Sequence, residues 1–435
     1  MEKSQNIIKK ETEVGLIPSD WEISTIGGEF SFLKNNSFSR EQLNPSAGSI
    51  QNVHYGDILI KYGEVLDVNK ETISYVNDGI SVVLSPKNQL QNGDVIFADT
   101  AEDEAAGKAC EIQGITDQLV VSGLHTIPMR SINHSFAPGF LGFCLNAGYY
   151  HDQLRSLMQG TKVLSVSKKS IQDTFFVYPT YKQEQQKIAD ALNAVGALIQ
   201  SLERIISKKI MMKKGAMQLL LSGKTRLKGN KKPWVEVELG ELGKLTGAGV
   251  DKTVNINEKP VRLLNFLDVY NRDRIYPHDL KMWVTASDYK IAKCNIQQGD
   301  IFLTPSSELP DDIGRSAVAM SDIDDACYSY HILRLRPSVK LDLTYSAYML
   351  KTAEYEEQIR FLSEGNGQRY VISPRNFREI LIRIPDDIQE QNAIGNVIAA
   401  MDNEIRDLET ERDKYVNIKQ GMMQMLLTGQ IRLPV

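Results

Sequence analysis

Two glycine-containing stretches could bind phosphate groups. Ser222-Gly223-Lys224-Thr225 has the Gly-Lys-Thr end of a phosphate-binding loop, in which backbone amides and a lysine hold nucleotide phosphates. Such a loop also requires a glycine five residues before Gly223, and that position holds Gln218. Thr246-Gly247-Ala248-Gly249 lacks the third glycine and the preceding apolar strand of a dinucleotide-binding loop. Neither stretch therefore predicts a nucleotide site.

Acidic residues and histidines give no stronger signal. Pro385-Asp386-Asp387 could belong to a nuclease carboxylate cluster, but no Glu-x-Lys follows, and an aspartate before a helix more simply caps that helix. None of the six histidines lies three or four residues from another, so no metal-binding pair is predicted. His125 and His331 lie in alternating runs typical of strands, and we assign both a structural role. An enzyme stays possible, but these residues nominate no nucleophile, base, metal or cofactor.

Length and composition indicate a globular protein of several domains. The chain has 435 residues, of which 42% are hydrophobic and 24% charged, with a net charge of −5. This is enough for two or more separate cores. No apolar stretch predicts a membrane span, and no signal peptide is expected at the start. The cysteines are far apart and indicate reduced thiols in a cytoplasmic protein: Cys110, Cys144, Cys294 and Cys327.

Two long amphipathic segments, related by a shift of 206 residues, would position any functional residues. The first begins at Gln183-Glu184-Gln185 and ends near Gly223, and the second begins at Gln389-Glu390-Gln391 and ends near Gly429. No proline interrupts them, and glycine is common where helices end. Each predicts a helix of about forty residues, about 60 Å long. Apolar residues at alternating steps of four and three would pair the helices: Ile188, Leu192, Val195, Ile199, Leu202, Ile206, Ile394, Ile398, Met401, Ile405 and Leu408.

Charge supports pairing of these helices in opposite directions. The stretch from Arg204 to Lys232 is basic, whereas the stretch from Asp402 to Asp413 in the second copy is acidic. An antiparallel pair would bring the two charges together. Solvated faces on ordinary core helices are the simpler alternative.

The repeat extends to the sequence before each helix. Trp21 and Trp234 each precede an Ile/Leu-Gly pair and lie 213 residues apart. Gly93-Asp94 and Gly299-Asp300 are separated by 206 residues. Short alternating runs such as Asp57-Ile58-Leu59-Ile60, bounded by turn residues, predict strands.

These patterns predict an α+β fold with a duplicated domain. The expected order is an N-terminal arm (1–14), a sheet-containing domain (15–180), a spacer helix (181–227), a second, similar domain (228–388) and a second helix (389–435). The two helices would form an antiparallel coiled coil about a pseudo-twofold axis.

In the order of these motifs the chain resembles the specificity subunits of type I restriction-modification systems, over essentially its whole length. The motifs include Trp-x4-Ile/Leu-Gly, Gly-Asp before an apolar strand, and Glu-Gln-x2-Ile at Glu184 and Glu390. Each helix ends in Leu-Leu-x-Gly-x-x-Arg-Leu, at Leu227 and Leu433. Each motif is modest alone, and their ordered duplication carries the resemblance. Insertions that lengthen the helices of some relatives are not evident.

The resemblance implies a non-catalytic subunit that binds double-stranded DNA and no membrane. Each domain would be a target recognition domain that reads one half of a split, asymmetric site. The helices would set the spacing and dock two modification subunits, which bind S-adenosylmethionine and methylate adenine. Restriction subunits would supply chemistry that depends on ATP and magnesium, so no cofactor is expected on this chain. A protein-interaction scaffold with duplicated domains, and an enzyme fused to a recognition domain, are the alternatives.

Three loops in each implied recognition domain carry donors and acceptors that could reach base edges or phosphates. The loop after the Gly-Asp strand offers Thr100, Glu102 and Lys108 in the first domain, and Ser306, Ser307, Glu308 and Arg315 in the second. The loop before the last strand offers Thr161, Lys162, Ser165 and Lys168, and Asn366, Gln368, Arg369 and Tyr370. The third loop offers Tyr55, Lys61 and Tyr62, and Tyr270, Asn271, Arg272 and Arg274. For any single residue, an exposed polar position without a ligand is the simpler interpretation.

Overall fold

The computed structural model describes residues 8–82, 85, 87–132, 136–227, 229, 232–366 and 368–434. It divides into two compact units, the first made of Met1–Leu202 and Glu411–Val435 and the second of Glu203–Thr410. Each long helix therefore contributes one half to each unit. Among the described residues, no helix combines the length and the apolar character needed to cross a membrane.

The first unit is built on two sheets. The five-stranded sheet has the order β4 (Phe30–Phe32), β13 (Thr126–Ser131), β9 (Val95–Ala98), β11 (Ala109–Gln113), β7 (Val65–Asp67). The four-stranded sheet has the order β12 (Leu119–Ser122), β6 (Ile50–Val53), β8 (Tyr75–Val76), β5 (Leu43–Asn44). The paired strands are β1 (Lys9–Thr12) with β2 (Gly15–Pro18), β3 (Trp21–Thr25) with β15 (Phe175–Pro179), and β10 (Thr100–Ala101) with β14 (Leu164–Ser165). The short helices are α1 (Ile26–Glu29), η1 (Arg40–Gln42), α2 (Tyr55–Ile60), α3 (Phe140–Cys144), α4 (Gly148–Leu157) and α5 (Lys168–Gln172).

The second unit repeats this architecture. Its five-stranded sheet has the order β17 (Gly243–Thr246), β26 (Leu333–Pro337), β22 (Ile301–Leu303), β24 (Ser316–Ala319), β19 (Arg274–Ile275). Its four-stranded sheet has the order β20 (Met282–Ala286), β18 (Lys259–Leu264), β25 (Ile323–Tyr328), β21 (Asn295–Ile296). A further sheet contains β23 (Ser306–Ser307), β28 (Arg369–Val371) and β27 (Glu364–Asn366), and β16 (Trp234–Glu238) pairs with β29 (Leu381–Pro385). The short helices are η2 (Leu239–Glu241), α7 (Phe266–Tyr270), η3 (Pro277–Asp279), α8 (Asp288–Lys293), η4 (Pro310–Asp312), α9 (Leu343–Ser346), α10 (Ala353–Leu362) and α11 (Pro374–Arg378).

The Gly-Asp motif of the first unit is a turn held by a buried ion pair. Gly93 has a φ of 88°, a left-handed conformation that glycine adopts without steric cost. The Asp94 carboxylate accepts the backbone N–H of Gln91 at 2.7 Å and is held by the Arg130 guanidinium at 2.7 Å. Asp94 is 1% exposed, and its hydrogen bond raises the pKa of Arg130. The motif is therefore an anchor inside the sheet.

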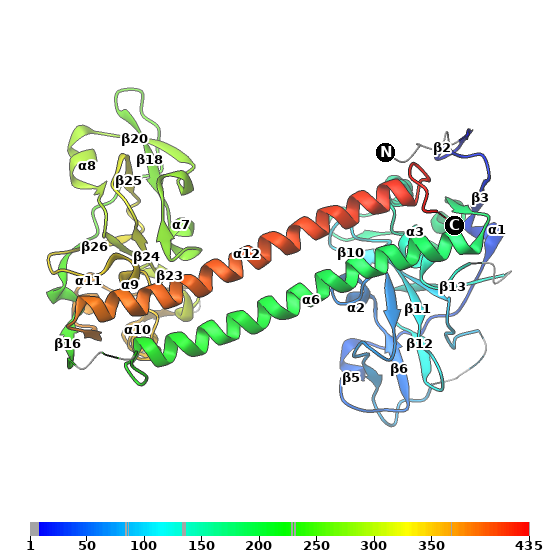
Figure 1. Cartoon of the computed structure of the whole chain (residues 1–435), viewed down its shortest axis with the longest axis horizontal. Coiled ribbons are helices and arrows are strands. Elements are labelled where there is room, and N and C mark those ends of the chain that lie inside the picture. Colours follow the sequence, from blue (N-terminus) through cyan, green and yellow to red (C-terminus); the bar gives the residue numbers. More distant parts are fainter. Residues whose placement is uncertain are drawn as a thin grey trace. The chain divides into compact units, whose positions relative to one another are not determined.

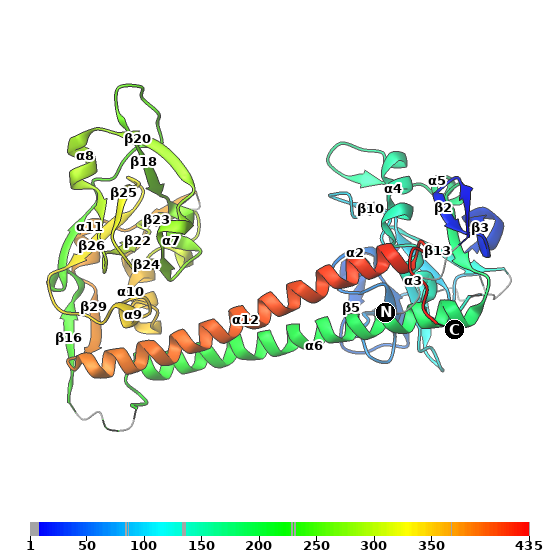
Figure 2. The same cartoon turned by 45° about the horizontal axis from the view of Figure 1, so that its top comes forward.

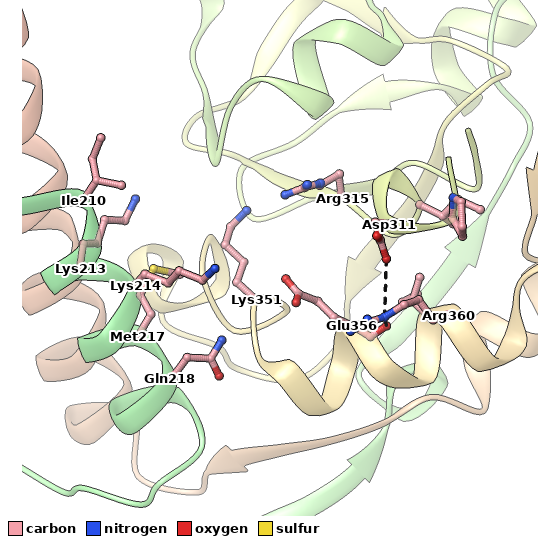
Figure 3. Close-up of a pocket in the computed structure, with 13 residues that line it drawn as sticks. Ile210, Lys213, Lys214, Met217, Gln218, Asp311, Arg315, Lys351, Glu356 and Arg360 are labelled. Carbon is pink, nitrogen blue, oxygen red and sulfur yellow. Dashed lines mark hydrogen bonds and ion pairs between the residues drawn. The ribbon is translucent and has the colours of Figure 1, made fainter. Parts of the chain in front are cut away.

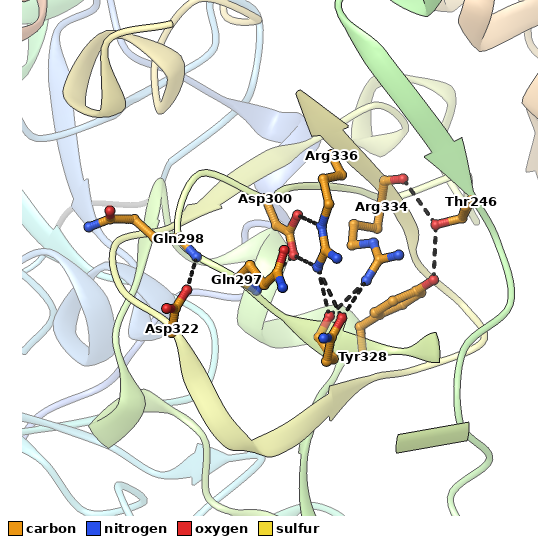
Figure 4. Close-up of polar contacts among 9 residues, drawn as sticks. Thr246, Gln297, Gln298, Asp300, Asp322, Tyr328, Arg334 and Arg336 are labelled. Carbon is orange, nitrogen blue, oxygen red and sulfur yellow. Dashed lines mark hydrogen bonds and ion pairs between the residues drawn. The ribbon is translucent and has the colours of Figure 1, made fainter. Parts of the chain in front are cut away.

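The second unit repeats this turn with further partners. Gly299 has a φ of 85°, and Asp300 accepts two hydrogen bonds of 2.6 Å from Arg336. Figure 4 shows Arg336 bound to Asp300, with Arg334 beside it. Arg336 also donates to the Asn295 side chain at 3.1 Å, and Arg334 donates to the Asn295 backbone oxygen at 2.7 Å. The same aspartate–arginine pair thus occurs 206 residues later.

The two long helices run side by side in opposite chain directions (Figures 1 and 2). They are α6 (Lys182–Leu221) and α12 (Ile388–Leu426). In the second unit, Lys209 pairs with Glu404 at 2.5 Å and Lys213 pairs with Asp402. These ion pairs join the basic stretch to the acidic stretch, as the antiparallel pairing predicts.

Part of the predicted helix-pairing seam also belongs to the two domain cores, together with the last turns of the other helix. Ile188 and Leu192 belong to the core of the first unit, and Ile394 and Ile398 belong to the core of the second. The first turns of each helix are therefore packed into the adjoining domain. Further along, Leu202, Ile206 and Ile405 are buried, and the remaining members of the seam are half-buried: Val195, Ile199, Met401 and Leu408.

Each helix start is also joined to the end of the other helix. Glu184 is 1% exposed and binds Arg432 with oxygen–nitrogen distances of 2.7 and 2.5 Å. Glu390 is 0% exposed and binds Arg226 at 2.9 and 2.5 Å. The motifs at the start and the end of the helices are thus two halves of one buried ion pair, formed once in each unit.

Two local predictions were wrong. Asp57-Ile58-Leu59-Ile60, expected as a strand, lies in α2, whose first turn is capped by the His54 side chain accepting the Gly56 N–H. His125 and His331 lie in the turns just before β13 and β26 rather than within strands. Of the expected N-terminal arm, residues 1–7 lie outside the described part of the chain.

Candidate nucleic-acid interface

In the first unit, strand pairing brings two of the three predicted loops together. Thr100 of β10 lies opposite Ser165 of β14 in antiparallel register. The Thr100 hydroxyl donates to the Asp99 carboxylate at 2.7 Å. Gly160, at the turn before β14, has a φ of 120°, and a Cβ there would lie 1.9 Å from the Val163 carbonyl oxygen. Only glycine can therefore form this turn.

The side chains around this pair form an exposed polar edge. Glu102, Thr161, Lys162 and Lys168 are all exposed. The Lys168 ammonium lies 4.6 Å from the centre of the Phe32 ring, which orients the cation without neutralising it. This edge offers donors and acceptors of both charge signs.

Two predicted residues of the first unit are used inside the protein. Tyr62 is 2% exposed, and burial raises the pKa of its hydroxyl. Lys108 donates to the backbone oxygens of Leu59 and Tyr62 at 3.1 and 3.0 Å, and burial lowers the pKa of its amine. Lys108 thus caps the C-terminal end of α2. Neither the Tyr62 nor the Lys108 side chain belongs to the exposed edge. Lys61 donates to the Thr72 oxygen, and Tyr55 is half-buried.

The second unit brings the corresponding loops together where β23 pairs with the β27–β28 hairpin. Ser306 and Ser307 of β23 pair with Val371 and Tyr370 of β28. The Arg369 guanidinium donates to the Ser306 hydroxyl at 2.9 Å and is otherwise exposed. Gln368 and Glu308 are exposed, and the backbone of Asn366 pairs with Arg369.

Arg315 stands apart from this hairpin. It pairs with Asp312 at 3.5 Å and lies over the Tyr270 ring, whose hydroxyl donates to the same Asp312 carboxylate at 2.8 Å. Of the remaining predicted residues, Arg272 pairs with Asp268 and Asp279, whereas Asn271 is exposed and Arg274 half-buried.

Arg315 also lines a pocket of about 510 Å³ within the second unit (Figure 3). The pocket is rich in cations, contributed by Lys213, Lys214, Arg315, Lys351 and Arg360. Four of them are paired with acids: Lys213 with Asp402, Arg315 with Asp312, Lys351 with Asp273 and Arg360 with Asp311. Its positive charge is therefore largely neutralised, and the exposed hairpin is the stronger candidate for binding DNA.

Two histidines outside the predicted loops were assigned a structural role from the sequence and were not selected as DNA-binding residues. His125 is the only non-glycine residue with positive φ among the described residues, at 52°. The His331 ring packs against the Tyr330 ring at a tilt, with ring centres 3.8 Å apart. The spacing of 206 between the two histidines was visible in the sequence, but their exposure and their neighbours were not.

Nothing in the described part of the chain suggests metal or thiol chemistry. No group of three or more histidine, cysteine, aspartate or glutamate side chains lies close enough there to hold a metal ion. The four cysteines are free and buried, and burial raises the pKa of the Cys144 thiol to about 12. A buried thiol with a raised pKa is unreactive.

Comparison with known proteins links this architecture to one class. Residues 231–417 match the family described as type I restriction modification DNA specificity domain. Over 456 residues the chain is 22% identical to the putative type I restriction enzyme MjaX specificity subunit of Methanocaldococcus jannaschii, covering 98% of this chain and 96% of that protein. The MjaVIII specificity subunit of the same organism is 26% identical over 298 residues, covering 64% of this chain and 67% of that protein.

Solved structures share the fold. The type I restriction-modification S subunit from M. genitalium superposes with a TM-score of 0.54 at 13% identity, covering 98% of both chains. A chain from a structure describing complex assembly and conformational transition of the type I R-M system gives a TM-score of 0.56 at 16% identity, covering 95% of this chain and 99% of that chain. At these identities the likeness concerns the fold, with two sheet-containing domains and two long helices.

Proposed function

We propose, from the premise that this chain belongs to the family of type I restriction-modification specificity subunits, that its two domains each read one half of a bipartite DNA site. A specificity subunit is the DNA-recognition subunit of its complex and not a catalytic one. The observation that carries the proposal is a polar strand pair that occurs at the same point of each repeat, β10–β14 in the first unit and β23–β28 in the second.

The two strand pairs carry different side chains, which favours an asymmetric site. The first presents hydroxyl groups with Lys162 and Lys168, and the second presents Arg369 beside Ser306. An arginine can donate two hydrogen bonds to the O6 and N7 atoms of guanine, whereas a serine or threonine reads base edges with less selectivity. Two readers with unlike side chains select two unlike half-sites.

The helices support a role as a spacer. Helices of 40 and 39 residues correspond to about 60 Å of rod. Half-sites that face the same side of B-DNA are about 34–36 Å apart, centre to centre, or a multiple of that. A rod of this length can hold two readers at such a separation.

An exposed apolar stripe on α6 supports docking of modification subunits on the helices. Ile205, Met212 and Leu219 lie seven residues apart and are 41%, 50% and 48% exposed. Apolar side chains at a heptad spacing suit a partner helix. The partners would supply the S-adenosylmethionine and ATP chemistry.

Methylation mapping tests the proposal. The chain is co-expressed with a modification subunit, and methylated adenines are located by single-molecule sequencing. We expect one split motif, half of which changes when residues 15–180 are exchanged for those of a relative and the other half when residues 228–388 are exchanged. A stable complex without methylation, and binding to DNA that does not weaken with salt, would instead support the interaction scaffold.

A further inference from the structure

His125 and His331 occupy equivalent places in the two units. They lie 206 residues apart, each in the turn that leads into an inner strand of the five-stranded sheet, β13 or β26. Neither belongs to the three loops predicted to read DNA. Their surroundings show that both lie at the exposed edge formed by those loops.

In the first unit, hydrogen bonds hold His125 beside the β10–β14 strand pair. Its carbonyl oxygen accepts the Asp99 N–H at 3.1 Å, and its Nδ1 lies 3.4 Å from the Asp99 carboxylate. The same carboxylate oxygen accepts the hydroxyl hydrogen of Thr100, which pairs with Ser165. A φ of 52° is unfavourable for histidine, so surrounding contacts must hold the residue in this conformation.

The His125 ring also touches the third loop. Its edge meets the Tyr55 ring, with ring centres 5.2 Å apart, and Tyr55 lies next to His54. The His125 side chain is nevertheless 48% exposed. It therefore stands where all three loops of the first unit meet. Because Nδ1 faces Asp99, Nε2 is the nitrogen left for a ligand.

In the second unit the same position has a cationic environment. The His331 ring packs at a tilt against Tyr330, which is 49% exposed. Burial, followed by the charges of Lys252 and Arg369, lowers the pKa of His331. Leu333, two residues after His331, pairs with Leu303 at the end of β22, and the chain continues from there to Ser306 of β23. His331 therefore also lies beside the candidate reading surface.

We propose that both histidines contact DNA directly, His125 at a base edge and His331 at a phosphate. This inference rests on the proposed function and assigns two further specificity and binding residues to it. Asp99 orients the His125 imidazole, and an oriented ring nitrogen can select one base-edge pattern in a groove. The charges of Lys252 and Arg369 act on His331, and a phosphate bound beside these three side chains would favour the protonated imidazole.

Of the two roles, only that of His331 predicts a dependence of affinity on salt and pH. A phosphate beside His331 would raise the pKa of its imidazole above that of the free protein, so the complex takes up a proton. Affinity should therefore rise as pH falls from 8 to 6, by up to about tenfold for each pKa unit of difference. For His331, the charged groups from neighbouring elements are Lys252 and Arg369. For His125, Asp99 faces the ring, and His54 and Tyr55 pack nearby.

The test uses the full chain in complex with its modification subunits, and DNA that contains the mapped methylation motif. His125→Asn removes the imidazole but keeps a residue that tolerates positive φ. We expect it to weaken binding to the motif about 5- to 100-fold, with unchanged binding to unrelated DNA. His331→Gln should weaken binding to both DNAs equally, lower the salt slope by up to about one at pH 6, and abolish the rise in affinity at low pH.

His278 lies outside these edges, its side chain is 79% exposed, and it serves as the matched control. His278→Gln should leave both affinities unchanged. A purely structural role would appear as a lower unfolding temperature with equal loss on all DNAs and an unchanged pH profile. If the unmodified complex binds its motif and both variants retain its affinity, salt slope and pH profile, this inference fails and the proposed function stands. If the unmodified complex shows no motif preference, the proposed function itself fails.

Discussion

The two units share their buried polar contacts and differ at their exposed strand pairs, β10–β14 and β23–β28. Asp94–Arg130 and Glu184–Arg432 in the first unit recur as Asp300–Arg336 and Glu390–Arg226 in the second. In each pair the carboxylate is at most 1% exposed. The aspartate–arginine pairs hold the turn before the central strand of each five-stranded sheet. The glutamate–arginine pairs join the start of one long helix to the end of the other.

The exposed strand pairs show where the copies diverged. Thr100 and Ser165 of the first unit correspond to Ser306 and Val371 in the second, where Arg369 binds Ser306. A histidine beside an aspartate in the first unit corresponds to a histidine under the influence of two cations in the second. A buried charge without its partner is costly, whereas an exposed loop residue can change freely. The comparison therefore separates residues that define the fold from residues that define the ligand.

The largest expected effect comes from breaking one of the shared buried pairs. Arg432 binds both Glu184 and Asp20, and Arg432→Met leaves the 1% exposed Glu184 carboxylate without its cation. We expect the free energy of unfolding to fall by about 3–5 kcal/mol, measured by urea denaturation. Arg226→Met should lower the free energy of unfolding by less, because Arg226 binds one carboxylate, that of Glu390. Arg432→Met combined with Glu184→Gln should recover part of the loss. Equal stability of Arg432→Met and the unmodified chain would contradict the assignment.

A second comparison concerns the glycines that shape each hairpin. Gly160 and Gly365 have φ of 120° and 155°, and a Cβ would lie 1.9 and 2.2 Å from the backbone oxygens of Val163 and Arg369. Gly160→Ala and Gly365→Ala should each cost about 1–3 kcal/mol of local stability, seen as faster hydrogen exchange in that hairpin alone. Each should also weaken recognition of one half-site and spare the other. Gly215→Ala, on α6 with no atom near its Cβ position, is the control and should stabilise by about 0.5–1 kcal/mol.

A third comparison ranks the two arginines predicted to read DNA. Arg369 is exposed and donates to the Ser306 hydroxyl, whereas Arg315 is held by Asp312 and the Tyr270 ring. Arg369→Ala should therefore cost about 1–3 kcal/mol in binding to the cognate site. Arg315→Ala should cost less. Competition binding with DNAs altered in one half-site measures both, and a larger loss for Arg315→Ala would reverse the assignment.

The sequence was informative wherever a pattern repeats over many residues. The heptad spacing, the absence of proline and the capping glycines predict two long helices, and α6 and α12 are 40 and 39 residues long. Charge along Lys209 and Lys213 against Asp402 and Glu404 predicts their antiparallel pairing. The shift of 206 predicts a duplicated fold, and the two five-stranded sheets have equivalent strand orders.

The sequence was less informative where contacts join distant residues. In α2, Asp57 is followed by the apolar run Ile58-Leu59-Ile60, which fits a short strand as well as a helix, and the side-chain pair Arg40–Asp57 spans 17 positions. The pairing of Thr100 with Ser165 joins loops 65 positions apart, which no local pattern reveals. Likewise, the apolar positions of Ile188 and Ile394 predict a buried helix face, but periodicity alone does not say whether a helix or a domain core covers it.

The smallest expected effects come from the ion pairs between the two long helices. They compare the coupling energy of an exposed pair with that of a shielded pair. Lys209–Glu404 has side chains that are 31% and 49% exposed, against 19% and 16% for Lys213–Asp402. A double-mutant cycle with Lys209→Met and Glu404→Gln should give a coupling of about 0.2–1 kcal/mol that fades in 1 M salt, because solvent and ions screen an exposed pair. The Lys213–Asp402 cycle should give a larger coupling that salt reduces less, because both side chains are shielded from solvent. Equal coupling energies with equal salt dependence would show that burial does not determine the strength of these two ion pairs.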